Sequence, residues 1–270
     1  MPRRPARSGT TVPRTNRLSK SRSWPLAIAS FVFMTVSCGS SNADRPGWLD
    51  TFPYGRIVRS VPTTEKIIAL TFDDGPNEPY TSRILDVLLD RDVKATFFVV
   101  GVNATRFPRT LLRIVEEGHA VGNHTWSHAR FSTMTPAWVQ AEIQQGADVI
   151  EILSGVRPRL FRPPGGDMGD VARLRRTCRR LECLIVNWSV DGLDDDDYRI
   201  PEVDPIVDRV LQQVEPGAII LLHDGDGLKT QPDKTATVQA LASILNGLLS
   251  RGYRLVTVPE LLASCHADGC

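Results

Sequence analysis

Several absences narrow the class of this sequence of 270 residues. It has no internal repeat and no low-complexity tract, and with 41% hydrophobic and 23% charged residues its composition is that of a globular protein, not a disordered, collagenous or fibrous one. It has no Gly-x-Ser-x-Gly motif, which disfavours a serine hydrolase. The length suits one large α/β domain or two small ones.

A basic excess is also absent, although the charge is unevenly distributed. The net charge is +1, yet residues 1–37 hold seven basic residues and no acidic one. Removing those seven positive charges leaves −6 for the rest of the chain. A mildly acidic body argues against a nucleic-acid partner, which would require a basic face. No feature of the sequence indicates a protein partner.

The N-terminal segment has the layout of an export signal. Its apolar run, Trp24–Val36, has 13 residues, which is short of the roughly 20 that span a bilayer but is typical of a signal peptide. The run leads into Thr35-Val36-Ser37-Cys38 and resembles a bacterial lipoprotein signal, in which the cysteine becomes the lipidated N-terminus. We therefore expect a signal peptide over residues 1–37 and an exported protein bound to the outer face of the bacterial cytoplasmic membrane through Cys38. Plain secretion with another cleavage point is the alternative.

The other four cysteines are an even number, which in an exported chain permits disulfides. We expect the pairs Cys178–Cys183 and Cys265–Cys270, because each brackets a short turn. Free buried thiols are the alternative. Neither pair has the Cys-x-x-Cys spacing of a metal site.

Short apolar runs alternate with longer amphipathic ones after residue 65. The predicted strands are Lys66–Phe72, Lys94–Val100, His119–Asn123, Arg159–Arg162, Cys183–Val190, Ala218–His223 and Arg254–Val258. The predicted helices are Tyr80–Asp90, Pro108–Glu117, Pro136–Leu153, Val171–Arg180, Val203–Val214 and Thr237–Ser250. About seven β-α units indicate parallel strands in a barrel or a doubly wound sheet. We expect a flexible tether at residues 38–64, one domain at 65–264 and a tail at 265–270.

In both folds ligands bind at the carboxyl ends of the strands, and chemically useful side chains fall there. Asp73 and Asp74 follow the first strand, and two adjacent carboxylates can divide cation binding from proton transfer. His124 and His128 follow the third, and neutral imidazole commonly binds divalent transition metals. Arg162 ends the fourth strand, just before two prolines and two glycines.

These segments together resemble the NodB-type polysaccharide deacetylases, carbohydrate esterase family four. The motifs are Thr71–Pro76 (TFDDGP), His124–His128 (HTWSH), Arg162–Gly166 (RPPGG), Asp191–Asp194 and Leu221–His223 (LLH). The resemblance covers residues 66–259 and implies a distorted (β/α) barrel of about seven repeats.

The resemblance also implies a role for each matching residue. Asp74, His124 and His128 would bind one divalent metal, most commonly Zn²⁺, with Co²⁺ or another transition metal as alternatives. Asp73 would be the general base, oriented by Arg162. The residues with supporting roles are His223 as general acid, Asp194 as its polarising partner, Asp191 as a support, the Gly165 N–H as oxyanion donor and Leu221 as part of the substrate wall.

The implied activity is removal of N-acetyl groups from N-acetylhexosamine residues of a cell-envelope polysaccharide, with release of acetate. Peptidoglycan is the expected polymer and chitin oligomers a surrogate. Two alternatives stay open: a non-catalytic glycan-binding module, and hydrolysis of an O-acetyl ester or another amide at the same metal site. Three residues depart from the family pattern, namely Gly165 for Tyr, Gly192 for Ser or Thr, and Asp195 for Trp. The acidic run Asp194–Asp197 suggests a preference for cationic or partly deacetylated glycans.

Overall fold

The computed structural model describes residues 46–194, 202–230 and 232–268, which belong to one compact unit of the chain. The predicted signal peptide, Cys38, Cys270 and most of the acidic run lie outside the described residues. Among the helices of the described part, none is both long and apolar enough to cross a membrane.

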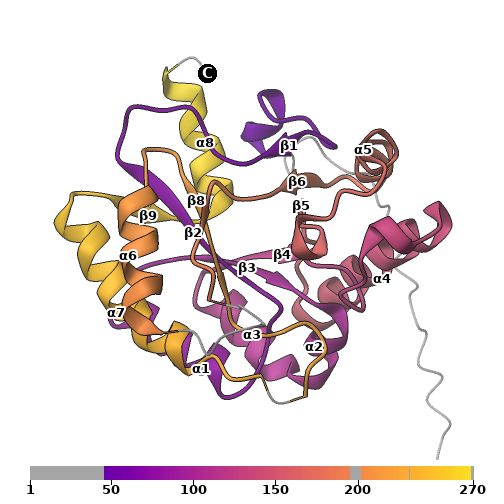
Figure 1. The fold of residues 1–270 in the computed structure, drawn as a ribbon. Helices are drawn as coiled ribbons and strands as arrows, with labels where there is room; N and C mark the ends of the chain where they lie inside the picture. The colour runs from indigo at the N-terminus through magenta and orange to yellow at the C-terminus, as the bar shows by residue number, and fades with distance from the viewer. Residues whose placement is uncertain (1–45, 195–201, 231, 269–270) are drawn as a thin grey trace, which may run out of the picture. The chain divides into compact units, whose positions relative to one another are not determined.

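The centre of the fold is a sheet in which all the pairings between named strands are parallel (Figure 1). Its strands, in spatial order, are β1 (Ile57–Val58), β6 (Leu184–Val186), β5 (Leu160–Phe161), β4 (Ala120–Asn123), β3 (Thr96–Val99), β2 (Ile67–Asp73), β8 (Ile219–His223) and β7 (Val190–Asp191), with β9 (Arg254–Val256) also paired to β2. The curled sheet and its helices confirm the predicted distorted (β/α) barrel.

The connection between β6 and β7 shows how far the sheet curls. These two strands lie towards opposite ends of the spatial order, yet only residues 187–189 join them. A connection of that length spans at most about 14 Å, so the two ends of the sheet must approach each other. The single strand predicted at Cys183–Val190 is therefore wrong: it is divided because its two halves pair with opposite ends of the sheet.

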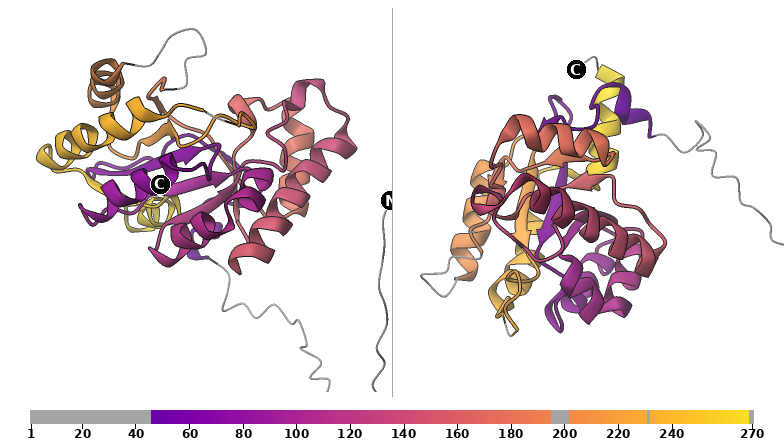
Figure 2. Two further views of the ribbon diagram at one scale, coloured as in Figure 1. Left: turned by 90° about the horizontal axis from the view of Figure 1, so that it is seen from below. Right: turned by 90° about the vertical axis from the view of Figure 1, so that its right-hand side faces the viewer.

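Eight helices are described, and they surround the sheet (Figure 2). They are α1 (Tyr80–Leu89), α2 (Gly101–Arg106), α3 (Pro108–Glu116), α4 (Pro136–Ser154), α5 (Val171–Arg180), α6 (Val203–Gln213), α7 (Thr235–Ser250) and α8 (Val258–Asp268). The six predicted helices are confirmed to within two residues at each end. The sequence analysis missed α2 and α8, and also three short 3₁₀ turns: η2 (Gly47–Asp50), η3 (Phe131–Thr133) and η4 (Pro164–Gly166).

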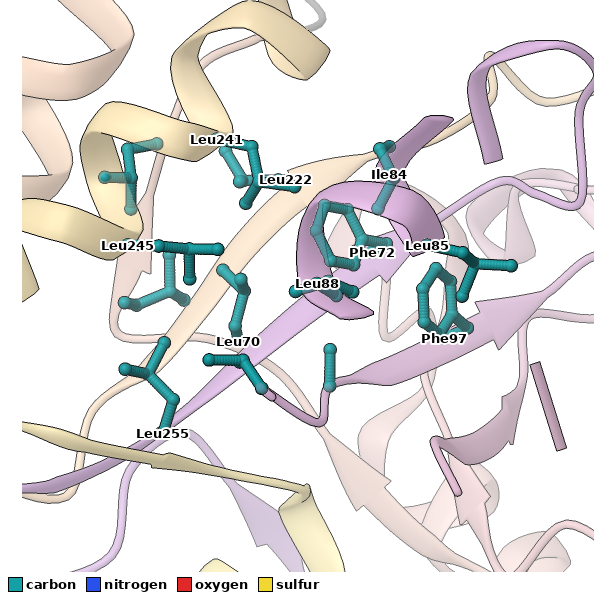
Figure 3. Close-up of a cluster of buried hydrophobic side chains, with 14 of the residues drawn as sticks. Leu70, Phe72, Ile84, Leu85, Leu88, Phe97, Leu222, Leu241, Leu245 and Leu255 are labelled. Atoms are coloured by element: carbon teal, nitrogen blue, oxygen red, sulfur yellow. The ribbon is translucent and has the colours of Figure 1, made fainter. Parts of the chain in front are cut away.

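Alternation along the central strand β2 separates two environments. Ile68, Leu70 and Phe72 point into a core that includes residues of α1 and α7, drawn in Figure 3. The alternate side chains point to the inner face, because successive residues of a strand face opposite ways. Ile67 and Ala69 there join an apolar cluster at the start of the strand. Thr71 and Asp73 continue the inner face towards the carboxyl end, where the candidate site lies.

The tether predicted at residues 38–64 is wrong for its described part. Trp48, Leu49 and Phe52 are buried, and β1 pairs with β6. These aromatic and aliphatic side chains cover the apolar starts of the strands together with residues of α8, which gives the segment a fixed place. The predicted tail also needs correction, because α8 extends through Asp268.

Candidate active site

Asp73 on β2 and His223 on β8, the predicted general base and general acid, lie side by side on adjacent strands. Asp73 is the Cα partner of His223, and Thr71 is the partner of Leu221. All four residues have the same parity along two parallel strands, so their side chains lie on the inner face of the sheet. Leu221 and His223 are buried at 3% and 7% exposure. The two predicted proton-transfer groups thus meet at one end of the barrel interior.

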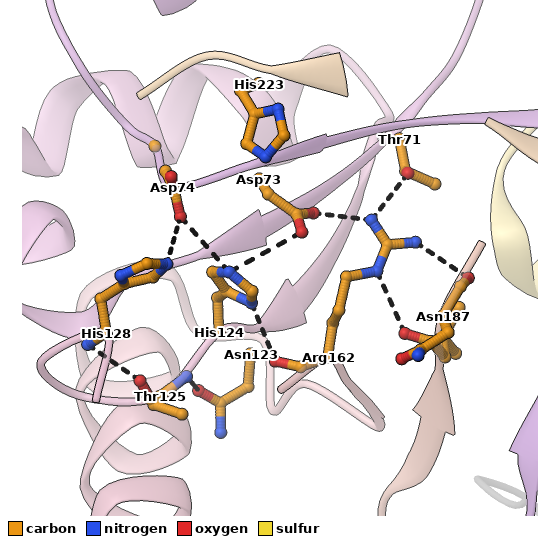
Figure 4. A network of polar contacts seen from close by, with 12 residues as sticks. Thr71, Asp73, Asp74, Asn123, His124, Thr125, His128, Arg162, Asn187 and His223 are labelled. Atoms are coloured by element: carbon orange, nitrogen blue, oxygen red, sulfur yellow. Dashed lines mark hydrogen bonds and ion pairs between the residues drawn. The ribbon is translucent and has the colours of Figure 1, made fainter. Parts of the chain in front are cut away.

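The predicted metal ligands converge at the same end (Figure 4). Asp74, His124 and His128 each offer a ligand atom, and these atoms lie within 4.8 Å of one another. The Oδ1 of Asp74 lies 3.3 Å from the Nε2 of His124 and 2.9 Å from the Nε2 of His128. One carboxylate and two imidazoles are a donor set typical of zinc and other divalent transition metals.

Hydrogen bonding around this cluster fits a cation. The Nδ1 of His124 lies 2.8 Å from the carbonyl oxygen of Arg162, which can only accept, so Nδ1 carries the proton and Nε2 presents a lone pair. That lone pair faces Asp74 Oδ1, a buried oxygen that has no hydrogen-bond partner among the described residues. The Nε2 of His124 and the Oδ1 of Asp74 are thus two lone-pair donors with no proton between them. A metal ion would bind to both atoms, so these residues fit the implied metal.

The pKa shifts in the metal-free cluster also favour the binding of a cation. Burial acts to raise the pKa of Asp74, but the adjacent His124 and His128 side chains outweigh it and hold the pKa well below its usual value. Burial acts to lower the pKa of His128, and Asp74 reverses that effect and raises it. The carboxylate is therefore ionised and ready to bind a cation.

A polar network from α4 holds the loop between the two histidines. Asn123 donates to the carbonyl of Ile143 and accepts from the N–H of Thr125, whose hydroxyl accepts from the N–H of His128. Thr125 and His128 have φ values of +70° and +57°, so the loop occupies a strained conformation that these contacts stabilise.

Glu142 of α4 is a part of this network that the sequence analysis missed. Its two carboxylate oxygens accept the backbone N–H and the hydroxyl of Ser127, each at 2.8 Å. The residue is 5% exposed, although an acidic residue on a helix is usually solvated. Its distance from the histidines in sequence left no signal, because only the fold brings α4 against the loop.

Arg162 is fully buried and is held on several sides. Its Nη1 donates to Asp73 Oδ1 at 2.6 Å and to Thr71 Oγ1 at 2.8 Å. Its Nε and Nη2 donate to the carbonyls of Val186 and Asn187, and the guanidinium lies 4.0 Å above the ring of Phe98. Burial lowers the pKa of Arg162, with Asp73 opposing that effect. The fixed guanidinium orients one oxygen of Asp73 and leaves the other, Oδ2, directed toward His124 at 3.7 Å.

The structure also brings His223 and Asp194 together. His223 Nδ1 lies 2.8 Å from Asp194 Oδ1, and Asp194 Oδ2 accepts from the hydroxyl of Thr237 at 2.7 Å. Burial acts to raise the pKa of Asp194, but the nearby His223 and Lys234 leave it lowered. Asp191 accepts from the N–H of Leu193 and so shapes the turn that carries Asp194.

Gly165 lies in the turn η4, three residues after Arg162, with a φ of +59°. Its N–H makes no hydrogen bond within the described part of the chain, while the next two N–H groups bond back to Pro163 and Pro164. The donor is therefore available, as its predicted role requires.

Asp224 is a second buried acid that the sequence analysis did not single out. It accepts from the Gly75 N–H at 3.0 Å and the Thr81 hydroxyl at 2.6 Å, and so joins β8 to the loop after Asp74. Burial raises the pKa of Asp224 to about 7, with added repulsion from Asp74.

The predicted Cys178–Cys183 disulfide is wrong, because both residues are free buried thiols. They pack with Phe161, Leu174 and Ile185 in an apolar cluster, and the turn is closed instead by the Cys183 N–H on the Cys178 carbonyl. A hydrogen bond from Cys183 and burial raise the pKa of Cys178. Cys265 is disulfide-bonded, and its predicted partner Cys270 lies outside the described residues.

Comparison with known proteins agrees with this site. A family model for polysaccharide deacetylase matches residues 60–180. A peptidoglycan-N-acetylglucosamine deacetylase of Bacillus cereus is 40% identical over 215 residues, which cover 79% of this chain and 96% of that protein. A chitooligosaccharide deacetylase of Sinorhizobium fredii is 36% identical over 217 residues, 77% of this chain and 97% of that protein.

A solved structure has the same fold. The crystal structure of a peptidoglycan N-acetylglucosamine deacetylase superposes with a TM-score of 0.70 and 34% identity, covering 79% of this chain and 94% of the other. Together with the relatives, this confirms the resemblance inferred from the motifs. The chain belongs to the NodB-type polysaccharide deacetylases of carbohydrate esterase family four and is a hydrolase of that family.

Proposed function

We propose that this enzyme removes the acetyl group from N-acetylglucosamine residues of peptidoglycan at a Zn²⁺ site formed by Asp74, His124 and His128. The observation that carries the proposal is the placement of Asp73. Arg162 holds one of its oxygens, the other points toward the metal cluster, and His223 stands at the same level on the next strand. The peptidoglycan and chitooligosaccharide activities of the relatives support an N-acetylhexosamine substrate.

The bound cation would supply Lewis-acid activation of the amide carbonyl and of a water molecule. Asp73 Oδ2 accepts a proton from the attacking water, because Oδ1 is already occupied by Arg162. The water oxygen adds to the acetyl carbon, and the N–H of Gly165 donates to the carbonyl oxygen as negative charge develops on it.

Collapse of this adduct breaks the carbon–nitrogen bond. His223 in its protonated form donates through Nε2 to the departing amine, while its Nδ1–H stays bonded to Asp194. Acetate carries away the water oxygen, and the sugar keeps a free amine. The proposed mechanism thus divides the work between a base on β2 and an acid on β8.

Acetate release tests this function. The chain from residue 43 onwards should be stripped of metal and assayed on peptidoglycan and on chitin oligomers with and without Zn²⁺, with Asp73→Asn as control. We expect release restored by Zn²⁺ and abolished in the variant. Release from an O-acetylated glycan but from neither N-acetylated substrate would assign a different substrate, and absence of metal binding would refute the triad.

We further propose that the enzyme is exported and anchored through a lipid on Cys38. The support is the basic segment, the short apolar run and the small residues before Cys38. Expression of the full chain in a bacterium with labelled fatty acid should label the wild type and not Cys38→Ala. Secretion of unlabelled protein would favour the alternative cleavage.

A further inference from the structure

Helix α5 has an unusual concentration of positive charge for a protein whose body is acidic. Five of its ten residues are arginine, and all five are exposed: Arg173, Arg175, Arg176, Arg179 and Arg180. Among the described residues, the one carboxylate within ion-pair distance of this set is Asp170, 3.4 Å from Arg173. Two other acidic residues lie close to the helix in sequence: Glu182 is already paired with Arg159, and Asp167 accepts the backbone N–H groups of Ser132 and Gly169. Four of the five arginines therefore have no ion pair with a carboxylate in the described part of the chain.

Three of these arginines line a hollow beside helix α4. The cavity has a volume of about 260 Å³ and is bounded by Arg173, Arg176 and Arg180 on one side and by Pro136, Ala137 and Gln140 on the other. Helices α4 and α5 lie next to each other on one flank of the sheet (Figure 1). The three arginines recur at intervals of three and four residues, so they form one row about 10 Å long. We call this feature the arginine groove.

The α4 wall of the groove has no charge to neutralise that row. Pro136, Ala137 and Gln140 are uncharged, and the acid nearest to them on α4, Glu142, is buried against Ser127. Gln140 adds an amide that can donate to the same ligand. Guanidinium groups recognise carboxylates in a planar, two-pronged geometry, so the groove is complementary to an extended ligand that carries several carboxylates.

Both walls of the groove follow residues of the candidate active site closely in sequence. The chain runs from His128 to Pro136 on one side and from Gly165 to Arg173 on the other, eight residues in each case. A smaller cavity of about 90 Å³, lined by Phe131, Met134 and Met168, adjoins both helices between these loops. This flank is therefore the path that we infer for a polymer with one sugar at the metal site.

We propose that the arginine groove binds the carboxylates of the wall polymer whose sugar is deacetylated at the metal site. This inference rests on the proposed function. Peptidoglycan carries free carboxylates on its stem peptides and on those muramic acid residues that bear no peptide, whereas chitin oligomers carry none. The groove would thus favour an anionic acetylated polymer over a neutral one. This is opposite to the preference for cationic glycans that the acidic run Asp194–Asp197 suggests, and Asp194 itself is buried against His223 and not on an exposed rim.

The test compares Arg173→Gln/Arg176→Gln/Arg180→Gln with the wild type. A matched control, Arg59→Gln/Arg109→Gln/Arg209→Gln, removes the same charge from exposed arginines elsewhere. Sedimentation with phosphate-free peptidoglycan measures binding, and acetate release from peptidoglycan and from chitin oligomers measures kcat and KM. Because sedimentation does not require turnover, failure of the groove is distinguishable from failure of the deacetylase assignment.

We expect the groove variant to bind peptidoglycan about tenfold more weakly and to show a raised KM on it, with chitin kinetics unchanged. Added salt should narrow the difference, because exposed charge pairs are screened. Glycan strands freed of peptides identify the source, because each muramic acid then exposes the carboxylate that its peptide had blocked. If binding to these strands depends on the three arginines, the muramic carboxylates are the ligand. If that dependence is lost, the stem peptides are.

Other results would overturn the proposal. Equal losses on peptidoglycan and chitin, or equal losses in the control variant, would indicate a general effect of charge or folding. An effect on phosphate-bearing sacculi alone would assign the groove to a phosphate polymer. Weakened binding to phosphatidylglycerol vesicles with unchanged binding to peptidoglycan would assign it to the membrane surface.

Discussion

Asp194 holds His223 through both oxygens of one carboxylate. Its Oδ1 lies 2.8 Å from the ring Nδ1, and its Oδ2 accepts the backbone N–H of the same histidine at 2.8 Å. The two contacts fix the ring and its protonation together, because a carboxylate on Nδ1 stabilises the imidazolium and leaves Nε2 to face the substrate.

Substituting Asp194 should therefore impair catalysis more than folding. In Asp194→Asn the amide keeps the shape but loses the charge, so we expect kcat to fall by about 10²-fold with bound metal unchanged. Thr237→Val is the matched control, since it removes one neutral hydrogen bond to the same carboxylate and should cost less than tenfold. Steady-state kinetics over pH 5 to 9 measure both. Equal losses in the two variants would contradict a specific role for the charge.

Metal removal should lower thermal stability through the Asp74–His124–His128 cluster. A ligand at 100 times its Kd stabilises the folded state by about 2.7 kcal/mol, which for a domain of this size raises Tm by about 5–10 °C. We expect chelation to lower Tm by this amount and Zn²⁺ to restore it. His128→Ala should show no response to Zn²⁺. A full response in that variant would place the metal elsewhere.

Glu142→Gln should weaken metal binding without touching the metal. The amide cannot accept from both the N–H and the hydroxyl of Ser127, so the loop that carries His128 loses part of its support. We expect Zn²⁺ affinity to fall about tenfold, the lower end of the range for residues that orient ligands. Glu151→Gln, on the exposed face of the same helix, is the control. Chelator competition gives the Kd, and equal affinities in the two variants would refute the role.

His119 should make stability depend on pH. Burial, with Lys94 adding to it, lowers the pKa of His119 to about 4 from a usual 6.5, and its Nδ1 accepts from the Ala95 N–H. Because the unfolded chain binds the proton more readily, this contribution is fully present above pH 6.5 and is lost as the pH falls toward 4. Its size is about 3 kcal/mol.

The substitution His119→Gln keeps a side-chain hydrogen-bond acceptor for the Ala95 N–H but removes the titratable imidazole. Urea unfolding at pH 4.5, 5.5 and 7 should show that the wild type loses more stability on acidification than the variant does. Parallel loss in the two proteins would exclude His119 as the source. Other groups, including Asp224, contribute equally to both curves and cancel in the difference.

The sequence by itself determined the parts of the site that are contiguous. Asp73 with Asp74, and His124 with His128, each lie in one short segment after a buried strand, so their chemistry could be inferred from spacing. The six amphipathic helices could also be predicted from local sequence, because the spacing of apolar residues is enough to identify the buried face of a helix. These segments sufficed to predict the family, the fold class and the metal ligands.

Only the tertiary structure decided how distant segments combine. The buried roles of Glu142 and Asp224, the division of β6 from β7, and the packing of residues 46–61 under the barrel depend on closure of the sheet, which has no local signature. The free thiols of Cys178 and Cys183 likewise reflect packing rather than spacing. The local sequence pattern determined which side chains lie at the ends of the strands. Closure of the sheet determined which of these side chains are in contact, because contacts between distant segments form only when the whole core forms.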